Sequence, residues 1–447
     1  MTSTRIRLAM SLLMLPALAA ACDDGGGGGS ADGDVDADTD GDTDTDADTD
    51  TELDTDTELD CAEEDRWWIW DLSEMPPSDR QICTTIRGEG QNVVVVVADD
   101  AWGSSVDQEV VGGLIAGWDE QTPLGAGAGI FELVTGLFGD PPDEFDGDPR
   151  VYLLLYEMEG YAGYSFDGYF KVDDQLDKWN SNRHETLHIN TADHSADSDY
   201  SLSVQSHEFQ HLVHWGHDPS EEAWLDESMS ELAMVLTGFG ADEAWVSSWL
   251  NDVHKDPLMS SGPDYNYGVL LLFGDYLWER FGDGFVYDLV SDDAHGATSL
   301  DGLLAELDPP LGFATVLGDL AGAIALNDSS IPQVWMGFNE IDVPVPASLV
   351  MEEGQDLEVT VPAEGGIAFA RSHDSIDDLT LIAEASDPQS CELRVGFRGP
   401  EGSELLYDGY EGGSTTVPLG AWPSGSTLWA AAANPTGSIV TLTLTLQ

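Results

Sequence analysis

The sequence predicts an α+β protein with strands near both ends of its folded region and helices in the middle. Two short apolar runs bounded by polar residues, 92–98 and 150–156, are typical of buried strands, and residues 105–139 between them have helical spacing. Residues 201–330 are mostly helical in pattern. After about Asp342, alternating polar and apolar stretches broken by glycine and proline predict an appended β-sandwich.

The size and charge of the chain narrow its possible functions. Its 447 residues are enough for more than one folded unit. The formal net charge is −72, and residues 23–60 contribute 15 Asp and 2 Glu with no basic residue, so the rest of the chain is also strongly acidic. Such a surface repels nucleic acid and anionic membranes. We therefore expect an extracytoplasmic protein that binds no nucleic acid. It is expected to be a monomer.

The N-terminus predicts export from the cytoplasm. Residues 1–22 contain two arginines, a short apolar run and small residues before Cys22, which is the pattern of a secretory signal too short to span a bilayer. Three alanines before Cys22, with Asp-Asp and a glycine run after it, resemble a bacterial lipoprotein cleavage site. We expect a lipid anchor on Cys22 that holds the protein at the cell surface or in the periplasm. Plain cleavage and secretion is the alternative.

Residues 23–60 form a low-complexity acidic segment with too few apolar groups to fold. Within it, residues 36–41 match the start of a calcium-binding loop, but Ala47 stands where the loop requires a bidentate Glu. At most weak Ca²⁺ binding is expected there, and the segment is interpreted as a solvated spacer.

The remaining three cysteines suggest one disulfide. In an oxidising compartment Cys61 and Cys83 pair by proximity in the sequence, which leaves Cys391 free. The changes in composition divide the chain into five parts: a signal peptide at 1–22, a disordered linker at 23–60, an α/β part at 61–200, a helical part at 201–340 and a β-rich domain at 341–447.

The pattern His-Glu-x-x-His, which on a helix binds zinc and supplies a general base, occurs at 184–188 and at 207–211. The second copy lies in a helical pattern, which places His207 and His211 on one face. The first copy alternates like a strand, where its histidines would lie about 13 Å apart at roughly 3.3 Å per residue, too far to share one zinc ion. We therefore predict His207 and His211 as zinc ligands. A spacing of twenty residues from His188 to Glu208 is the one observation favouring the first copy.

Several residues are candidates for the third ligand. The best candidate is Glu227, which lies on a predicted second helix, from which a carboxylate can approach the histidines from the side. Glu231, one turn further, could accept the free N–H of a ligating histidine, although exchanged roles for the two glutamates stay open. His217 also stays open as a ligand. His214 is expected to be packed or exposed, because three ligands from one straight helix seldom converge on one ion.

Three segments resemble gluzincin-type zinc metallopeptidases, most closely the hyicolysin-like neutral peptidases. They are HEFQHLVH from His207, WLDESMSE from Trp224 and YNYGVLLLFGDYL from Tyr265. The resemblance implies a zincin-like domain with a sheet-containing N-terminal part, an active-site helix and a helical C-terminal part; the β-sandwich falls outside it. Because similar peptidases have a Tyr before a Gly on the following helix, it also implies Tyr267, or else Tyr265, as the donor to the oxyanion. The family usually has Asn-Glu-Gly where this chain has Asp226-Glu227-Ser228.

These observations predict a zinc metallopeptidase, a hydrolase acting on extracellular proteins or peptides. Zinc lowers the pKa of its bound water, and Glu208 removes the proton as the water attacks the peptide carbonyl. One alternative is a catalytically inactive surface lipoprotein with a binding or structural role. Another is a zinc hydrolase with a substrate other than peptides.

Overall fold

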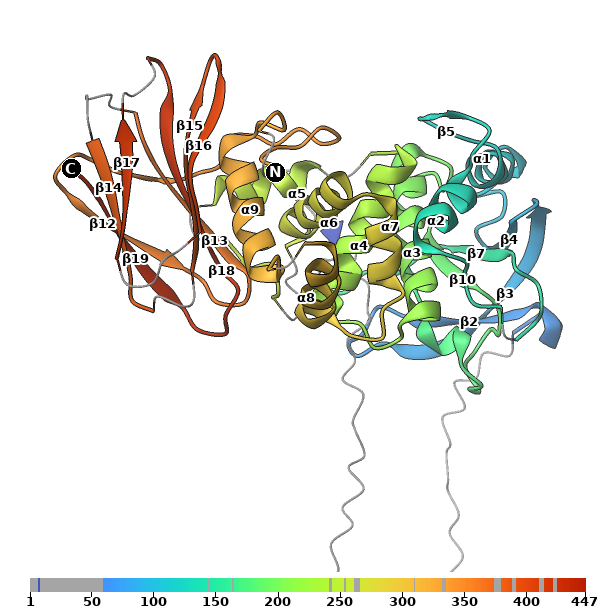
Figure 1. Ribbon diagram of the computed structural model, residues 1–447. Coiled ribbons are helices and arrows are strands. Elements are labelled where there is room, and N and C mark those ends of the chain that lie inside the picture. Colours follow the sequence, from blue (N-terminus) through green and yellow to red (C-terminus); the bar gives the residue numbers. More distant parts are fainter. Residues whose placement is uncertain are drawn as a thin grey trace, which may run out of the picture.

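The computed structural model describes a mixed α+β protein. The described residues are 59–143, 145–162, 165–240, 243–252, 255–260, 266–308, 310–331, 335–373, 379–387, 391–409, 414–420 and 424–447, with the backbone of Arg7–Leu8. Cys22, residues 23–58 of the acidic linker with its suggested calcium site, and Tyr265 lie outside them. Figure 1 shows a first sheet with its helices at one end of the molecule, a helical middle and a second β-rich part at the other end.

The first sheet has six strands in the order β2-β3-β4-β7-β10-β9. The strands β4, β7 and β10 are parallel neighbours and fully buried, as the continuous apolar sequences of β4 and β7 predict. The short strand β9 pairs antiparallel with β10 at the edge. The strands are β2 (Arg66–Asp71), β3 (Ser78–Glu89), β4 (Val93–Ala98), β7 (Val151–Tyr156), β9 (Gly168–Phe170) and β10 (Thr186–Asn190).

Two helices, rather than one, occupy residues 105–139. Helix α1 (Gln108–Asp119) begins after Asp107, whose carboxylate accepts the N–H groups of Glu109 and Val110, and α2 is Ile130–Phe138. Between them, a small hairpin of β5 (Gln121–Thr122) and β6 (Gly125–Ala126) interrupts the helical pattern. Gly125 in this hairpin has a positive φ angle, a conformation that glycine adopts without strain.

The expected disulfide is confirmed: Cys61 is bonded to Cys83, which lies on β3, and Cys391 is free and buried. The bond fixes the start of the folded region against the first sheet.

The middle of the chain is helical, as predicted. Ser198 caps α3 by accepting the N–H of Ser201, and Gly238 ends α4 in the left-handed conformation. Among the described residues, no helix is sufficiently long and apolar to cross a membrane. The helices are α3 (Asp199–His217), α4 (Ala223–Thr237), α5 (Glu243–Asn251), α6 (Tyr267–Phe281), α7 (Asp283–Val290), α8 (Gly296–Leu307) and α9 (Phe313–Leu326).

The C-terminal part contains two further sheets that share an apolar core. One has the order β11-β13-β18-β15-β16 and the other β12-β19-β14-β17. Buried and half-exposed residues alternate along β19, which matches the predicted alternation. The strands are β11 (Leu349–Val350), β12 (Asp356–Val361), β13 (Gly366–Ser372), β14 (Leu379–Ala385), β15 (Glu392–Gly399), β16 (Gly402–Gly409), β17 (Ser414–Gly420), β18 (Thr427–Asn434) and β19 (Val440–Leu446).

Helix α9 connects this β-rich part to the rest of the molecule. It packs on the five-stranded sheet, chiefly on β18 and β15 (Figure 1). Leu317 on α9 and Trp429 on β18 belong to the same continuous apolar core as the first sheet. The β-rich part is therefore not a freely appended module, because one of its faces is covered by a helix of the middle part.

A buried ion-pair cluster fastens this contact. Arg394 on β15 donates from Nε to Asp319 Oδ1 on α9 at 2.7 Å, and Arg280 on α6 donates to Asp319 Oδ2 at 2.8 Å. Arg394 is 2% exposed and Asp319 1%. Gly318 leaves room for the guanidinium, because a Cβ there would lie 3.0 Å from Arg394 Cζ.

Replacing Arg394 by Gln should lower the free energy of unfolding by about 3–5 kcal/mol, because it leaves a buried carboxylate oxygen without its charged partner. Urea denaturation would measure this. The matched Arg183→Gln variant, which removes an exposed ion pair with Asp177, should change the free energy far less. Equal effects of the two substitutions would contradict the assigned role of Arg394.

Candidate metal centre

The second His-Glu-x-x-His copy lies within α3, as predicted, and its two histidines face each other across one turn. The Nε2 atoms of His207 and His211 are 3.1 Å apart. Both side chains are buried, because α3 runs through the interior with fourteen of its residues buried. A spacing of four residues on a helix accounts for the shared face.

Helix α4 brings a carboxylate to the same point. Glu227 Oε2 lies 3.4 Å from His207 Nε2 and 3.7 Å from His211 Nε2. The structure thus brings together the three residues that the sequence suggested as ligands, and one donor atom from each lies within 4.8 Å of the others. Within the described ranges, His217 does not belong to this group; it lies beside Gly139 instead.

Carboxylates on the far side of each imidazole determine which ring nitrogen carries the proton. Glu231 Oε1 lies 3.3 Å from His207 Nδ1, and Asp226 Oδ2 lies 2.9 Å from His211 Nδ1. Each Nδ1–H can therefore donate to a carboxylate, which leaves each Nε2 with a lone pair. The geometry favours Glu227 over Glu231 as the direct ligand, because only Glu227 approaches both Nε2 atoms.

This donor set fits a metal ion. When both imidazoles are neutral with the proton on Nδ1, the two Nε2 lone pairs and the carboxylate oxygen are all acceptors, separated by 3.1, 3.4 and 3.7 Å. Ligand bonds of about 2.0–2.1 Å around a tetrahedral zinc ion put ligand atoms about 3.3 Å apart. The observed separations bracket that value, so these three residues can hold a four-coordinate cation with one position left for water or substrate.

The electrostatics of the cluster also favour a cation. Burial by itself would lower the pKa of His207, but Glu227 and Glu231 outweigh it and raise that pKa to about 9. Burial would likewise lower the pKa of His211, but the nearby carboxylates, chiefly Asp226, outweigh it and leave that pKa well above its ordinary value. The surrounding carboxylates thus stabilise positive charge at this point.

Glu208 lies between the two ligating positions and is fully buried. Its Oε2 accepts the backbone N–H of Phe170, on the edge strand β9, at 2.9 Å. Its Oε1 has no hydrogen-bond partner among the described residues. Burial raises the pKa of this carboxyl group. One oxygen is thus fixed by the backbone, and the other is available to accept a proton.

Tyr267, the first residue of α6, lies at the same site. Its ring centroid is 6.3 Å from that of His207 and 6.0 Å from that of Trp245 on α5. The following Gly268 permits this arrangement, because a Cβ there would lie 2.3 Å from the Trp245 carbonyl oxygen.

Asp226 is a site residue that the sequence reasoning missed. Its Oδ2 faces His211, and its Oδ1 lies 2.8 Å from Nδ1 of His214. Burial by itself would raise the pKa of Asp226, but the two histidines hold it well below the usual range. His214 is expected to be either packed or exposed, and in the structure it is buried. The available signal in the sequence is an acidic residue directly before the expected ligand Glu227, at a position where similar peptidases usually have Asn.

Among the described residues, the first His-Glu-x-x-His copy belongs to no group that could hold a metal ion. Residues Thr186–Asn190 are strand β10, as predicted. His184 precedes the strand, where Nδ1 lies 2.5 Å from Asp146 Oδ2 and the ring stacks on Tyr152. His188 is buried, with Nε2 2.9 Å from Asp174 Oδ2.

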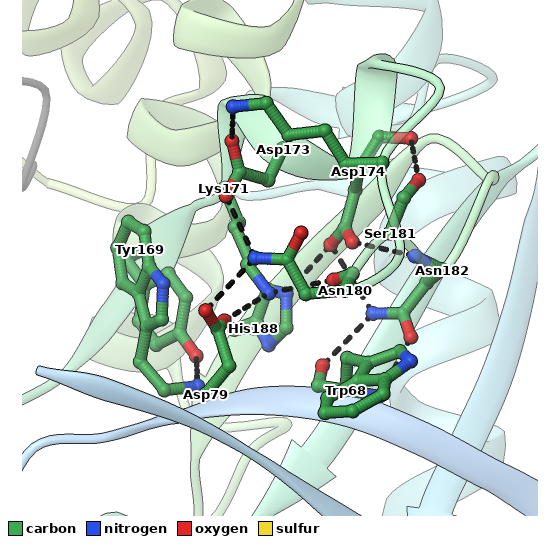
Figure 2. A network of polar contacts seen from close by, with 12 residues as sticks. Trp68, Asp79, Tyr169, Lys171, Asp173, Asp174, Asn180, Ser181, Asn182 and His188 are labelled. Atoms are coloured by element: carbon green, nitrogen blue, oxygen red, sulfur yellow. Dashed lines mark hydrogen bonds and ion pairs between the residues drawn. The ribbon is translucent and has the colours of Figure 1, made fainter. Parts of the chain in front are cut away.

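His188 belongs instead to a buried polar network between β2, β10 and the segment after β9 (Figure 2). Lys171, directly after Phe170, donates from Nζ to Asp79 Oδ1 at 2.8 Å and to the Asn180 carbonyl at 2.9 Å. Asn182 exchanges hydrogen bonds with the backbone of Trp68 on β2. The network fixes the end of β9, which carries the amide that holds Glu208.

Comparisons with known proteins add little. No protein-family model and no curated protein matches the chain. A crystal structure of PirA aligns with 14% identity and a TM-score of 0.18 over 22% of this chain and 96% of that one; the periplasmic g-type lysozyme inhibitor PliG of Aeromonas hydrophila aligns with 13% identity and 0.16 over 23% and 100%.

IMPa metallopeptidase in complex with T-antigen aligns with 13% identity and a TM-score of 0.14 over 67% of this chain and 37% of that one. IMPa from Pseudomonas aeruginosa in complex with an O-glycopeptide aligns with 12% identity and 0.14 over 79% and 46%. The chain therefore spans less than half of these metallopeptidases. At such TM-scores these similarities say nothing about function. The function has to be inferred from the geometry of the site.

Glu185, the second residue of the first copy, provides a test of buried charge. It is fully buried, neither carboxylate oxygen has a hydrogen-bond partner among the described residues, and burial raises its pKa to about 8. Its protonated form is therefore favoured by folding, and the protein should lose stability as pH rises from about 4.5 to about 8. Glu185→Gln should be roughly 1–4 kcal/mol more stable than wild type at pH 8 and close to it at pH 4.5.

Urea denaturation at the two pH values measures this difference. Glu306→Gln, on an exposed position of α8, serves as the matched control and should show no such pH-dependent gain. If Glu185→Gln gains no stability at pH 8, this carboxyl group is not protonated in the folded protein.

Proposed function

We propose that this protein is a zinc-dependent endopeptidase that hydrolyses peptide bonds of extracellular proteins. The observation that carries the proposal is the convergence of His207 Nε2, His211 Nε2 and Glu227 Oε2, with Glu208 beside them on the same helix. Three acceptors that leave one coordination position open, next to a carboxylate, are the parts that metal-assisted hydrolysis requires.

His207, His211 and Glu227 would hold the zinc ion. When bound, zinc supplies Lewis acidity, which lowers the pKa of a water molecule and polarises a carbonyl oxygen. Glu231 positions His207 by accepting its Nδ1–H. This contact fixes the ring orientation and makes Nε2 a stronger donor of its lone pair.

Glu208 acts as general base through Oε1, which takes a proton from the attacking water while the Phe170 amide holds Oε2. The raised pKa of this carboxyl group suits the reverse transfer, in which Oε1 returns the proton to the leaving amine. Tyr267, beside His207, is assigned as the donor that stabilises the oxyanion of the tetrahedral intermediate. A lipid anchor on Cys22 and the acidic spacer would hold this domain away from the membrane.

A second candidate, a catalytically inactive surface lipoprotein, is favoured by one observation. His207, Glu208, His211 and Glu227 are each at most 2% exposed, so a peptide reaches them only after neighbouring residues move. Measuring zinc binding and peptide cleavage separately distinguishes the two candidates.

The test compares zinc content and cleavage of an unfolded protein substrate for wild type and four variants. Glu208→Gln should keep zinc and lose at least about 100-fold in cleavage rate, because the general base is removed. Glu227→Ala and His211→Ala should lose zinc as well as activity. His184→Ala is the control from the first His-Glu-x-x-His copy and should keep both.

The possible failures are separate. Cleavage that survives Glu208→Gln would refute the peptidase mechanism. Zinc binding without cleavage by wild type would favour the inactive lipoprotein. Loss of zinc in His184→Ala but not in His211→Ala would show that the wrong copy was chosen.

A further inference from the structure

We infer that Asp226 and His214 form a positioning pair for His211, so that a histidine outside the ligand set controls how tightly the site binds its metal. The inference rests on the proposed metal centre and adds two residues to it. Neither residue would touch the metal or the substrate.

The geometry places one carboxylate between two histidines. Asp226 Oδ2 is 2.9 Å from His211 Nδ1, and Oδ1 is 2.8 Å from His214 Nδ1. His211 and His214 are three residues apart on α3, so both rings reach the same carboxylate on α4. His214 is 1% exposed and Asp226 8%.

The residue types suit this arrangement. A carboxylate has two acceptor oxygens and can receive an Nδ1–H from each ring, whereas the amide of an Asn has one acceptor oxygen and a donor NH₂ group. An Asp at position 226 therefore offers a second acceptor oxygen, and His214 Nδ1 lies 2.8 Å from it, within ion-pair distance but not aligned for a hydrogen bond in the structure. Within the described part of the chain, the other hydrogen-bonding neighbour of the His214 ring is the Gln210 amide nitrogen, at the longer distance of 3.5 Å from Nδ1.

The pair should act on the metal through His211. The contact of Oδ1 with His214 Nδ1 restrains the carboxylate, and Oδ2 keeps the proton of His211 on Nδ1. The lone pair of Nε2 then points toward the Nε2 atom of His207 and Oε2 of Glu227. Removing a hydrogen bond to the non-coordinating nitrogen of a ligating histidine typically lowers metal affinity 10–100-fold. Without His214, Oδ1 would be a buried charged oxygen without its nearby imidazole, and the carboxylate would be free to turn away from His211.

The deciding experiment measures zinc affinity of the full chain by chelator competition. His214→Phe keeps the ring volume but removes the donor, so it should raise the dissociation constant for zinc about tenfold. His214→Asn should stay near wild type, because its amide nitrogen can donate from about the place of Nδ1. His217→Phe is a matched control on the same helix and should have no effect. The absorption spectrum of the Co²⁺-loaded protein should change in His214→Phe alone, since it reports ligand geometry.

Asp226→Asn provides a second route that does not depend on His214→Phe folding well. It should weaken zinc binding, because its NH₂ group would face the Nδ1–H of His214. Adding His214→Phe to the Asp226→Asn variant removes the opposing donor. It should therefore weaken zinc binding much less than His214→Phe does in the wild-type protein.

The results separate this inference from the proposed function. If wild type binds no zinc, the proposed function fails and this inference fails with it. If wild type binds zinc, an unchanged affinity and Co²⁺ spectrum in His214→Phe overturn the inference alone, as does His214→Asn binding as weakly as His214→Phe. If the effects of Asp226→Asn and His214→Phe on zinc affinity are additive, the inference is also overturned.

Discussion

The candidate site depends on the packing of α4 against α3. Helix α3 supplies the imidazoles and the general base, but by itself it offers no carboxylate to hold the Nδ1–H groups or to complete the ligand set. Helix α4 supplies all of these: Glu227 toward the Nε2 atoms, Glu231 behind His207 and Asp226 behind His211. Because α3 is covered on nearly every side, the packing has little freedom to shift, and the separations between donor atoms are set by helix geometry.

This packing places many charged groups where water does not reach. Transferring an ion from water to a protein interior costs roughly several kcal/mol even after relaxation, so each of these groups needs a partner. The histidines have carboxylates on both sides, and a cation among the three acceptors would satisfy the rest. Metal binding and folding of this region should therefore be coupled, as in other proteins whose ligands come from separate elements.

The remaining elements hold the surroundings of α3 in place. The buried network around Lys171 fixes the end of β9, from which the Phe170 amide reaches Glu208 (Figure 2). On the other side, α6 carries Tyr267 at its start and Arg280 near its end. Arg280 joins the cluster at Asp319 that fastens α9 to the five-stranded sheet. The β-rich part is thus connected to the element that delivers Tyr267.

The sequence by itself determined the local features. Periodicity distinguished the strand that contains His188 from the helix that contains His207 and His211, because the two structures repeat at different intervals. Proximity in an exported chain suggested the Cys61–Cys83 bond, and spacing on a second helix suggested Glu227. Only the tertiary structure decided which carboxylate faces which ring nitrogen, that Asp226 joins His211 to His214, and that α9 covers the β-rich part. Those relations depend on how separate helices and sheets are rotated and packed against each other, and periodicity along one segment carries no information about that.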